Sequence, residues 1–496
     1  MPQSLKVLFL AAEAYPFVKI GGLGDVAGSL PAALKEVSSS LDNEAGVDIR
    51  LVIPFHGAIQ RKAYPFRGKA SFQVPSVDGP VPAEALTMQM AGIPVYLIAG
   101  PPIQADAPVY NPDIAEDGLK FTFFSLAALE LARSLNWIPH IVHANDWHTA
   151  PALYSLYVHR AEDRFYYNTA TVLGLHNLPY LGVGAGPALS LFGLPPATGS
   201  SLPDWAQHVP LPLGLLAADH IVAASPTYAR EILTPEFGSG LQDFLRKRSG
   251  SISGILNGID EKRWSPENDP LLAANYTQST LEKKVANKVA LQEELGLQID
   301  PEIPFLAMVS RLDHQKGVSL VPSALRQLTG VPWQAVILGT GDPVLEASIR
   351  RLETDIPDRV RAAIRFDAAL SHRIYAGADM LLIPSRYEPC GLTQMIAMRY
   401  GCIPVARAVG GLKDTIRDYR SQASTGFLFQ TASPRALANA IRRALRVYSD
   451  QNAWRGLQER GMATDFSWKR FARQYLTLYR SLAEAAYQRS ISKARL

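Results

Sequence analysis

The stretch VLFLAAEAYPFVKIGGLGDVAGSLPAAL, residues 7–34, contains in order the parts of a strand–loop–helix unit. The apolar run Val7–Ala11 suits a strand that is buried on both faces. The apolar run Val26–Leu34 suits the helix that follows. Between them lies the loop Lys19-Ile20-Gly21-Gly22-Leu23-Gly24-Asp25, whose small residues let a ligand approach the backbone. The segment predicts a βα unit with a polar loop after its strand.

This loop is a candidate anion site. The backbone N–H groups of Gly21 and Gly22 at the start of a helix attract phosphate, and Lys19 adds a positive charge. The spacing matches neither the P-loop nor the dinucleotide-binding fingerprint. On spacing alone, a tight turn in which Asp25 caps the helix explains the glycines equally well.

Short apolar runs closed by Gly, Pro or polar residues recur along the chain. In the first half they are Val7–Ala11, Ile49–Ile53, Val95–Ile98, Ile141–His143, Ala170–Leu175 and Ile221–Ala224. In the second half they are Phe305–Val309, Ala335–Leu338, Ile364–Phe366, Met380–Ile383, Ile403–Ala406 and Phe427–Phe429. Such runs suit parallel strands covered by helices. We expect an α/β protein of two doubly wound, Rossmann-like domains with a ligand cleft between them, because ligands bind outside the carboxyl ends of these strands.

The chain of 496 residues is long enough for two or three domains. Turn-forming residues around Asn257-Gly258 mark a boundary, which predicts domains over residues 1–256 and 257–467. The last segment, residues 468–496, contains a helix with Phe471, Tyr475, Leu478 and Leu482 at helical spacing. Its apolar face must pack against one domain, and the spacing leaves open which.

Composition narrows the function class. The net charge of +4 is small, and no run of Lys and Arg is long enough to follow a nucleic-acid backbone. The only cysteines, Cys390 and Cys402, need no disulfide framework, which favours a reducing compartment. The first apolar run is too short for a signal peptide, and no segment reaches the ~18 apolar residues of a membrane span. We expect a soluble, cytoplasmic protein.

Two loops of the second half carry charges directly after expected strands. Arg311 and Lys316 lie in SRLDHQKG, residues 310–317, where a guanidinium fork and a point charge suit a diphosphate. They could stabilise the charge on a departing phosphate; alternatively, they are solvated cations paired with Asp313. Glu388 could accept hydrogen bonds from sugar hydroxyls or cap the helix that follows. The adjacent Cys390 lacks a neighbouring base and suits a packing role.

The segment HANDWH, residues 143–148, ends another expected strand. Its two histidines are five positions apart across a strand–helix junction, a spacing that does not suit zinc ligands on one helix face. Sugar contacts or helix capping are favoured over a metal site. His176, which closes the run 170–175, could likewise hydrogen-bond a substrate or satisfy its own turn.

Taken together, these segments resemble the bacterial glycogen synthase and plant starch synthase family over nearly the whole chain and in the family's order. The combination of Lys19-x-Gly-Gly-Leu with Ser385-Arg386-Tyr387-Glu388-Pro389-Cys390-Gly391-Leu392 is highly specific. The other matching segments are 143–150, 175–177, 225–232, 238–260, 309–317 and the turn at 410–415.

The resemblance implies the GT-B fold, with the last helix crossing back to the first domain. It implies retaining transfer of glucose from ADP-glucose to the non-reducing end of an α-1,4-glucan such as glycogen, with release of ADP and without a metal or other cofactor. Lys19, the Gly21 and Gly22 amides, Arg311 and Lys316 would meet the donor diphosphate. Glu388 would contact the transferred glucose, and His176 would present its carbonyl to the reacting sugar. Further candidate contacts are Asp25, Asp146, Asn257, Tyr375, Cys390, Gly391, Leu392 and Thr393.

The chain departs from the family pattern without losing a proposed charged group. Ile20 replaces the usual Thr or Val, Asn145 stands where His is frequent, Gly174-Leu175 replaces Thr-Ile, and Tyr387 replaces Phe. Two alternatives stay open: a GT-B transferase that uses UDP-glucose or a small acceptor, and a glucan-binding relative without catalysis. A phosphorylase is disfavoured, because no lysine lies in a convincing pyridoxal-phosphate context. Acceptor length, oligomeric state and regulation do not follow from the residues.

Overall fold

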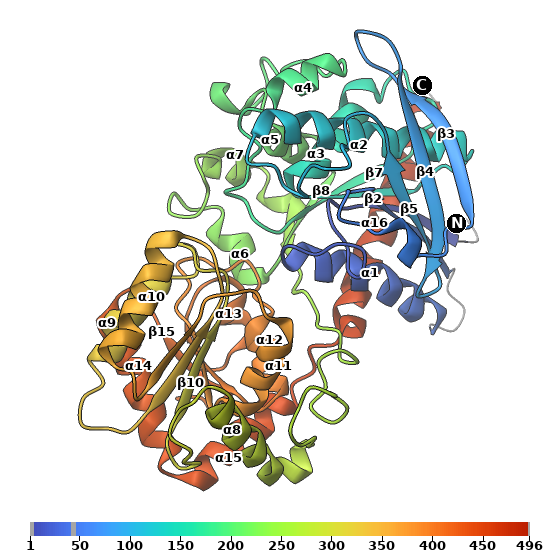
Figure 1. Ribbon diagram of the computed structural model, residues 1–496. Coiled ribbons are helices and arrows are strands. Elements are labelled where there is room, and N and C mark those ends of the chain that lie inside the picture. Colours follow the sequence, from blue (N-terminus) through green and yellow to red (C-terminus); the bar gives the residue numbers. More distant parts are fainter. Residues whose placement is uncertain (1–3, 41–45, 495–496) are drawn as a thin grey trace. The chain divides into compact units, whose positions relative to one another are not determined.

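The computed structural model describes residues 4–40 and 46–494, with side chains to residue 489. The chain divides into two compact units, which are described separately (Figure 1). Unit 1 runs up to Gly258 and resumes at Trp468, and unit 2 comprises Ile259–Ser467. The last helix is therefore part of unit 1, although it is the last element in sequence.

Unit 2 is built on a parallel sheet in the order β12-β11-β10-β13-β14-β15. The strands are β10 (Phe305–Val309), β11 (Gln334–Leu338), β12 (Val360–Ala363), β13 (Met380–Ile383), β14 (Ile403–Arg407) and β15 (Phe427–Phe429). The first three strands in sequence extend the sheet in one direction and the last three extend it in the other. The direction in which successive strands are added to the sheet reverses between β10 and β13. These two parallel strands pair through Leu306 with Met380. The carboxyl ends of these two strands flank the position where a doubly wound sheet binds its ligand.

Unit 1 has a larger sheet in the order β3-β4-β5-β2-β1-β6-β7-β8-β9 among its described residues. Its strands are β1 (Ser4–Leu10), β2 (Gly46–Pro54), β3 (Gly68–Val74), β4 (Val81–Met90), β5 (Ile93–Ala99), β6 (Ile141–Asn145), β7 (Ala170–Leu175), β8 (His220–Ala223) and β9 (Ile252–Gly254). Among the strands that the structure describes in this unit, only the β3–β4 and β4–β5 pairs are antiparallel. The reversal lies between β1 and β6, which pair through Val7 with Ile141.

The prediction of two doubly wound sheets is confirmed, with corrections at particular strands. The predicted strand Ile364–Phe366 is wrong: β12 ends at Ala363, and residues 364–366 form the loop after it. The antiparallel strands β3 and β4 were not predicted, because their alternating polar and apolar residues lack the continuous apolar run of a buried parallel strand. The short β9 carries no such run either.

Helices connect the strands in both units. In unit 1 they are α1 (Gly22–Ser39), α2 (Ile114–Ser134), α3 (Asp146–His159), α4 (Gly186–Leu191), α5 (Pro210–Ala217), α6 (Pro226–Glu231), α7 (Gln242–Lys247) and α16 (Trp468–Ala494). In unit 2 they are α8 (Lys284–Glu294), α9 (Val321–Arg326), α10 (Pro343–Asp355), α11 (Ala368–Gly377), α12 (Thr393–Arg399), α13 (Gly410–Thr415), α14 (Pro434–Tyr448) and α15 (Gln451–Met462). Short 3-10 helices span Arg61–Ala63, Asp204–Ala206, Ser249–Ser251, Gln278–Lys283 and Val318–Leu320. No helix of the described residues is long and apolar enough to cross a membrane.

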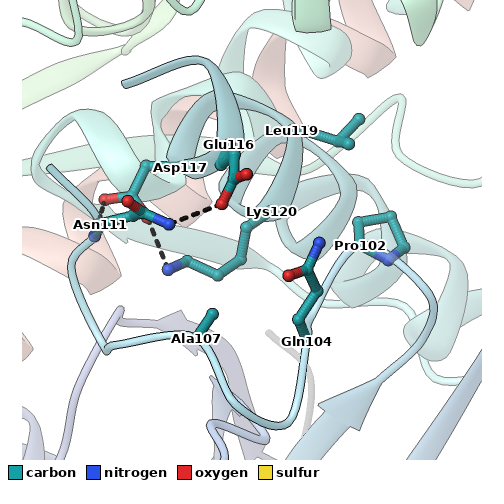
Figure 2. A pocket seen from close by; sticks show the side chains of 8 residues that line it. All are labelled: Pro102, Gln104, Ala107, Asn111, Glu116, Asp117, Leu119 and Lys120. Carbon is teal, nitrogen blue, oxygen red and sulfur yellow. Dashed lines mark hydrogen bonds and ion pairs between the residues drawn. The ribbon is translucent and has the colours of Figure 1, made fainter. Parts of the chain in front are cut away.

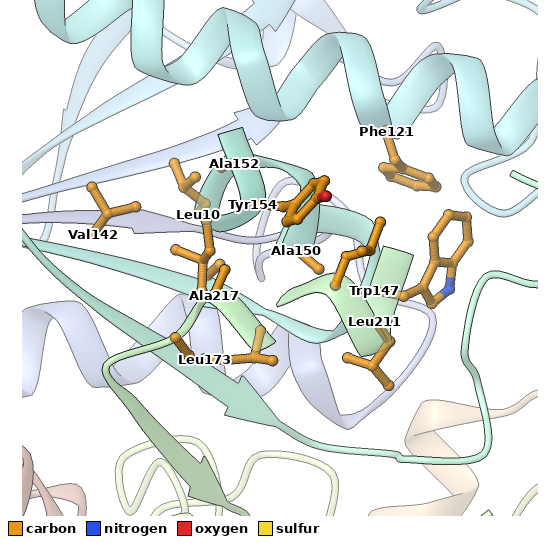
Figure 3. Packing of buried hydrophobic residues seen from close by; sticks show 14 of the residues in the cluster. Leu10, Phe121, Val142, Trp147, Ala150, Ala152, Tyr154, Leu173, Leu211 and Ala217 are labelled. Atoms are coloured by element: carbon orange, nitrogen blue, oxygen red, sulfur yellow. The ribbon is translucent and has the colours of Figure 1, made fainter. Parts of the chain in front are cut away.

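The sheet of unit 1 is covered on both faces by apolar side chains. On one face, Leu10 and Val142 of the sheet pack with Phe121 of α2 and Trp147 of α3 (Figure 3). Helices α1 and α16 belong to a second buried cluster, which also contains the strand residues Phe9 and Ile141. Burial on both faces explains why these strands are apolar at successive positions.

Helix α16 is held to unit 1 by a row of buried aromatic side chains. Phe471 and Tyr475 are each 2% exposed, and Tyr479 is fully buried. The Tyr479 hydroxyl forms a hydrogen bond with Nδ1 of His143 in β6. The helix thus supplies both apolar area and a polar partner to the central strands.

We predict that Phe471→Ala lowers the free energy of unfolding by about 3–5 kcal/mol, because it leaves a cavity beside α1 and the sheet. The matched control is Tyr487→Ala on the same helix, where the side chain is 56% exposed and the change should stay within about 0.5 kcal/mol. Urea titrations followed by circular dichroism measure both. Equal stability of the two variants would contradict the packing of α16.

Candidate functional site

The reversal point of unit 2 holds a carboxylate that is paired on both oxygens. Glu388, which is 5% exposed, follows β13. The Lys316 ammonium, from the loop after β10, lies 2.8 Å from Oε1 and 2.7 Å from Oε2. The Ser385 hydroxyl donates to Oε2 at 2.9 Å. The structure therefore brings together Lys316 and Glu388, two predicted site residues that are 72 positions apart.

The loops after β10 and β13 touch through their backbones. The Arg386 N–H donates to the Gln315 carbonyl at 2.7 Å. Gly317 has φ +67°, and a Cβ at this position would lie 2.1 Å from the Pro384 carbonyl oxygen. Only glycine combines this left-handed backbone with so close an approach, so Gly317 allows Lys316 to reach Glu388.

Arg311 lies on the same loop and is half exposed. Its guanidinium contacts Asp313 at 3.2 Å and donates to Gln315 Oε1 at 3.3 Å. The Asp313 carboxylate also accepts the Lys316 backbone N–H at 2.9 Å. The ion pair between Arg311 and Asp313, which the sequence left open, is present in the structure. The Arg311 guanidinium nevertheless remains exposed to solvent at the edge of the sheet.

The segment after Glu388 is fixed by backbone contacts. The Gly411 N–H donates to the Glu388 carbonyl at 3.0 Å, and a Cβ on Gly411 would lie 2.1 Å from the Cys390 carbonyl oxygen. The Gln394 side-chain amide donates to the carbonyls of Cys390 and Gly391. Gly391, Leu392 and Thr393 lie directly at the start of α12 and are half-buried, whereas Cys390 is 4% exposed. Gln394, which shapes this turn, carried no signal in the sequence.

In unit 1, the predicted anion site of the glycine loop already holds a carboxylate. Glu13, which follows β1 and is 1% exposed, accepts the N–H of Gly21 at 3.0 Å and of Gly24 at 3.2 Å, and also that of Ile20. Burial raises the pKa of Glu13, against the opposing effect of these donors. The expectation that the Gly21 amide is open to a phosphate is therefore corrected: Glu13 occupies that position. The hydrogen bonds of Glu13 require the loop after β1 to fold back so that Gly21 and Gly24 lie beside Glu13. The sequence does not indicate this turn.

Lys19 and Asp25 of this loop form an ion pair with 2.6 Å between Nζ and Oδ2. Asp25 lies in the first turn of α1, and the N-cap position of this helix is Gly21 rather than Asp25. Both side chains remain partly exposed, so Lys19 is able to exchange Asp25 for an anionic ligand.

His176, after β7, is held by two residues at the junction of β6 and α3. Asp146 Oδ1 accepts the His176 backbone N–H at 2.7 Å and that of Asn177 at 3.2 Å. Asn145 Oδ1 lies 2.8 Å from His176 Nε2. Asp146 has φ +54°, which is a strained backbone value for a residue other than glycine. Such strained conformations cluster at functional sites. Burial raises the pKa of Asp146, against the opposing effect of His176 and its N–H.

The neighbouring histidines are neutral groups of the unit 1 core. Burial, assisted by the nearby His176, lowers the pKa of His143 to about 3. Burial, assisted by Lys120 and His56, lowers the pKa of His148 to about 3. Within residues 4–40 and 46–494, no three His, Cys, Asp or Glu side chains are grouped so that they could hold a metal ion.

Two predicted contact residues lie in buried positions. Tyr375 is 2% exposed near the far end of α11, and its ring contacts Trp264 and Tyr400. We do not retain it as a ligand contact, because its side chain belongs to the core of unit 2. Asn257 is 6% exposed at the end of the first segment of unit 1.

The structure shows one candidate that the sequence did not indicate. Phe366, in the loop after β12, is 88% exposed. It lies at the same carboxyl edge of the sheet as the loops of Lys316 and Glu388, because all six strands are parallel. An exposed phenyl ring at a ligand-binding edge offers a flat stacking surface.

A small pocket in unit 1 lies beside α2. Its lining includes the buried ion pair of Asp117 and Lys120, with 2.6 Å between Nζ and Oδ1 (Figure 2). The remaining lining residues are Pro102, Gln104, Ala107, Asn111, Glu116 and Leu119. Its volume of about 30 Å³ is the space of roughly one water molecule. The pocket is too small for a sugar.

Two protein families match this chain, one within each of the two units. Residues 6–247 match the family described as the starch synthase catalytic domain, and residues 294–456 match the glycosyl transferases group 1. The glycogen synthase of Anaeromyxobacter dehalogenans strain 2CP-C is 43% identical over 491 residues, covering 97% of this chain and 100% of the relative. The glycogen synthase of Thermotoga maritima is 40% identical over 489 residues, covering 96% and 98%.

Two solved structures are similar to this chain over nearly its whole length. The catalytic domain of starch synthase IV from Arabidopsis thaliana, bound to ADP and acarbose, has a TM-score of 0.85 and 32% identity; the match covers 97% of this chain and 100% of that domain. A sucrose-phosphate synthase from Thermosynechococcus elongatus has a TM-score of 0.60 at 20% identity, covering 97% and 100%, and shows the fold alone.

We predict that the free energy of unfolding falls as the pH decreases from about 6.5 towards 4. Burial lowers the pKa of His56 to about 4, so between these values the unfolded chain takes up a proton that the folded protein does not, and stability present above pH 6.5 is lost. His143 and His148 act in the same direction. His56→Gln should reduce the slope by up to about 1.4 kcal/mol per pH unit. Urea titrations at pH 7, 6 and 5 test this, with the exposed His159→Gln as control; equal slopes would contradict it.

Proposed function

Because the chain belongs to the glycogen and starch synthase family of glycosyltransferases, we propose that it transfers glucose from ADP-glucose to the non-reducing end of an α-1,4-glucan. We propose further that the anomeric configuration is retained and that no metal takes part. The observation that carries this assignment is the group of Lys316, Glu388 and Ser385 at the reversal point of unit 2. It offers a cation for a phosphate and a carboxylate for sugar hydroxyls at one sheet edge.

Lys316 is proposed to exchange partners when the donor binds. In the structure its ammonium pairs with the Glu388 carboxylate at 2.7 Å. A diphosphate at the same edge competes for this cation, and Arg311 provides a second positive charge. Transfer of Lys316 towards the phosphate frees the Glu388 oxygens to accept hydrogen bonds from the glucose hydroxyls. The cations then stabilise the charge that develops as ADP leaves.

We assign Phe366 as the residue that contacts the adenine base of the ADP-glucose donor. Its ring is exposed at the carboxyl edge of the unit 2 sheet, where it could stack on adenine. The Arabidopsis relative was solved with ADP, which supports an adenine nucleotide here. Cys390 and Cys402 are buried and take part in no disulfide, which fits the cytoplasmic location that we propose.

Unit 1 is proposed to act on the reacting sugar through His176 and on anionic groups through Lys19. The His176 carbonyl is assigned to stabilise oxocarbenium character. A double displacement would need a carboxylate nucleophile close to the anomeric carbon. Asp146 is engaged by the backbone N–H groups of His176 and Asn177, so this carboxylate does not suit that role.

We therefore propose that the leaving phosphate takes the proton of the incoming hydroxyl on the same face of the sugar. The new glycosidic bond forms as the bond to the ADP oxygen breaks, and the proton ends on ADP. This route requires cations and backbone groups and no protein nucleophile. A glucosyl-enzyme trapped on Asp146 or Asp25 would contradict it.

We predict that Glu388→Ala and Lys316→Ala each lower kcat for glucose transfer from ADP-glucose to glycogen by at least about 100-fold, as expected for loss of groups that stabilise transition-state charge. Transfer of radiolabelled glucose, measured in EDTA, checks this and the metal-free proposal together. The matched controls are the exposed Glu293→Ala and Arg351→Ala in the same unit, which should retain activity.

The same assay separates the remaining alternatives. A preference for UDP-glucose in side-by-side reactions would keep the fold and change the donor. Glycogen binding without transfer from either donor would favour a non-catalytic glucan-binding protein. Activity that requires an added divalent cation would contradict the metal-free mechanism.

We predict that Phe366→Ala raises KM for ADP-glucose by roughly 10-fold, with a smaller change in kcat, because stacking on a base contributes about 1–3 kcal/mol. Phe366→Trp should retain the wild-type KM, since it preserves the stacking surface. Ile299→Ala, at a residue that is 53% exposed before β10, is the control for loss of a surface apolar side chain. An unchanged KM in Phe366→Ala would remove this residue from the donor site.

A further inference from the structure

The orientation of the Asn145 side chain is fixed by its surroundings. Asn145 is fully buried at the end of β6, and its amide nitrogen Nδ2 lies 2.7 Å from the carbonyl oxygen of Leu10 in β1. A carbonyl oxygen only accepts hydrogen bonds, so the NH₂ group must face Leu10. The amide oxygen Oδ1 therefore faces His176, where Nε2 lies 2.8 Å away.

This orientation determines where the His176 ring carries its proton. Oδ1 is an acceptor only, so Nε2 of His176 must be the donor. Burial lowers the pKa of His176, against the opposing effect of Asp146, which favours the neutral ring. A neutral ring protonated on Nε2 has an unprotonated Nδ1, and no described residue provides a hydrogen bond to that atom. Nδ1 is thus available as an acceptor for a sugar hydroxyl.

Gly174 provides the space that this arrangement needs. A Cβ at Gly174 in β7 would lie 2.6 Å from Asn145 Oδ1, 2.8 Å from His143 Nε2 and 3.2 Å from His176 Nε2. Contacts below 3 Å require one of these side chains to move, and His143 is held on its other side by Tyr479. The backbone of Gly174 is not left-handed, so the requirement is for space and not for a glycine conformation.

We propose that Asn145 is a positioning residue that holds the His176 ring with Nε2–H bonded and Nδ1 directed to the reacting sugar, and that Gly174 is required because it leaves room for this hydrogen bond. The proposal rests on the glucan synthase function proposed above and adds two residues to it. Asn145 acts through His176 and touches no reacting atom. Both residues are departures from the family pattern, and the contact between them indicates that the two departures belong together.

The test compares Asn145→Ala, Gly174→Ala and the double variant in the glycogen transfer assay. Each single change should lower kcat roughly 10- to 100-fold, because loss of a positioned group near the reacting centre costs this much, with little change in KM for ADP-glucose. The double variant should lose less than the product of the two single losses, since truncation of Asn145 removes the contact of the added methyl group with Oδ1, although its contact with His143 remains. Gly250→Ala, where a Cβ meets no atom within 4 Å, is the control and should keep full activity.

A spectroscopic measurement tests the hydrogen bond without substrate. In protein labelled with ¹⁵N-histidine, the His176 ring N–H should exchange slowly with solvent, assigned by its absence in His176→Gln. The signal should be lost in Asn145→Ala and in Gly174→Ala, while melting temperatures show that both variants remain folded. If the wild type transfers no glucose, the proposed function fails, and this signal still reports on the positioning.

Three results would overturn the proposal. Losses in kcat that multiply in the double variant would show that Gly174 acts independently of Asn145. A normal kcat per folded molecule in Asn145→Ala would reduce Asn145 to a structural role. A His176 ring N–H that exchanges rapidly in the wild type would show that the hydrogen bond does not hold the ring.

Discussion

The reversal of strand order within each sheet is the constraint on which the rest of the structure depends. Between β10 and β13, and between β1 and β6, the connecting helices leave the sheet in opposite directions. No connection covers the carboxyl ends of these central strands, so polar groups can be placed there beside an apolar core. Lys316 and Glu388 occupy this position in unit 2, and Glu13 and Asp146 occupy it in unit 1.

Each buried carboxylate at these positions has partners, because an unpaired buried charge is strongly unfavourable. In unit 1 the partners are backbone N–H groups: those of Ile20, Gly21 and Gly24 for Glu13, and of His176 and Asn177 for Asp146. Backbone donors are fixed by the fold and cannot leave. In unit 2 the partners of Glu388 are two side chains, the Lys316 ammonium and the Ser385 hydroxyl. The carboxylates of unit 1 therefore fix loops through the backbone, whereas the exchange proposed for Lys316 requires only that a side chain moves.

The sequence predicted those features that depend on local pattern. Continuous apolar runs identified most parallel strands, and polar residues placed directly after these runs predicted that Lys316, Glu388, Asp146 and His176 lie at the carboxyl edges of the sheets. What it missed depends on contacts between distant segments. The role of Glu13 follows from a turn that brings it back to Gly21, and the exposure of Phe366 follows from β12 ending at Ala363. The burial of Tyr375, which is 2% exposed, likewise depends on contacts with distant segments, those of Trp264 and Tyr400.

The departures from the family pattern differ in their physical meaning. Ile20 is 58% exposed, and its N–H donates to Glu13; any residue except proline supplies that N–H, so its side chain is free to vary. Tyr387 likewise contributes its carbonyl oxygen, which accepts from Gln315. Asn145 and Gly174 instead meet through side-chain space, where an amide needs one donor and one acceptor contact and its neighbour must lack a Cβ. A change at either position alone loses the fit, so the departures at Asn145 and Gly174 are physically coupled, whereas the departure at Ile20 is independent of both.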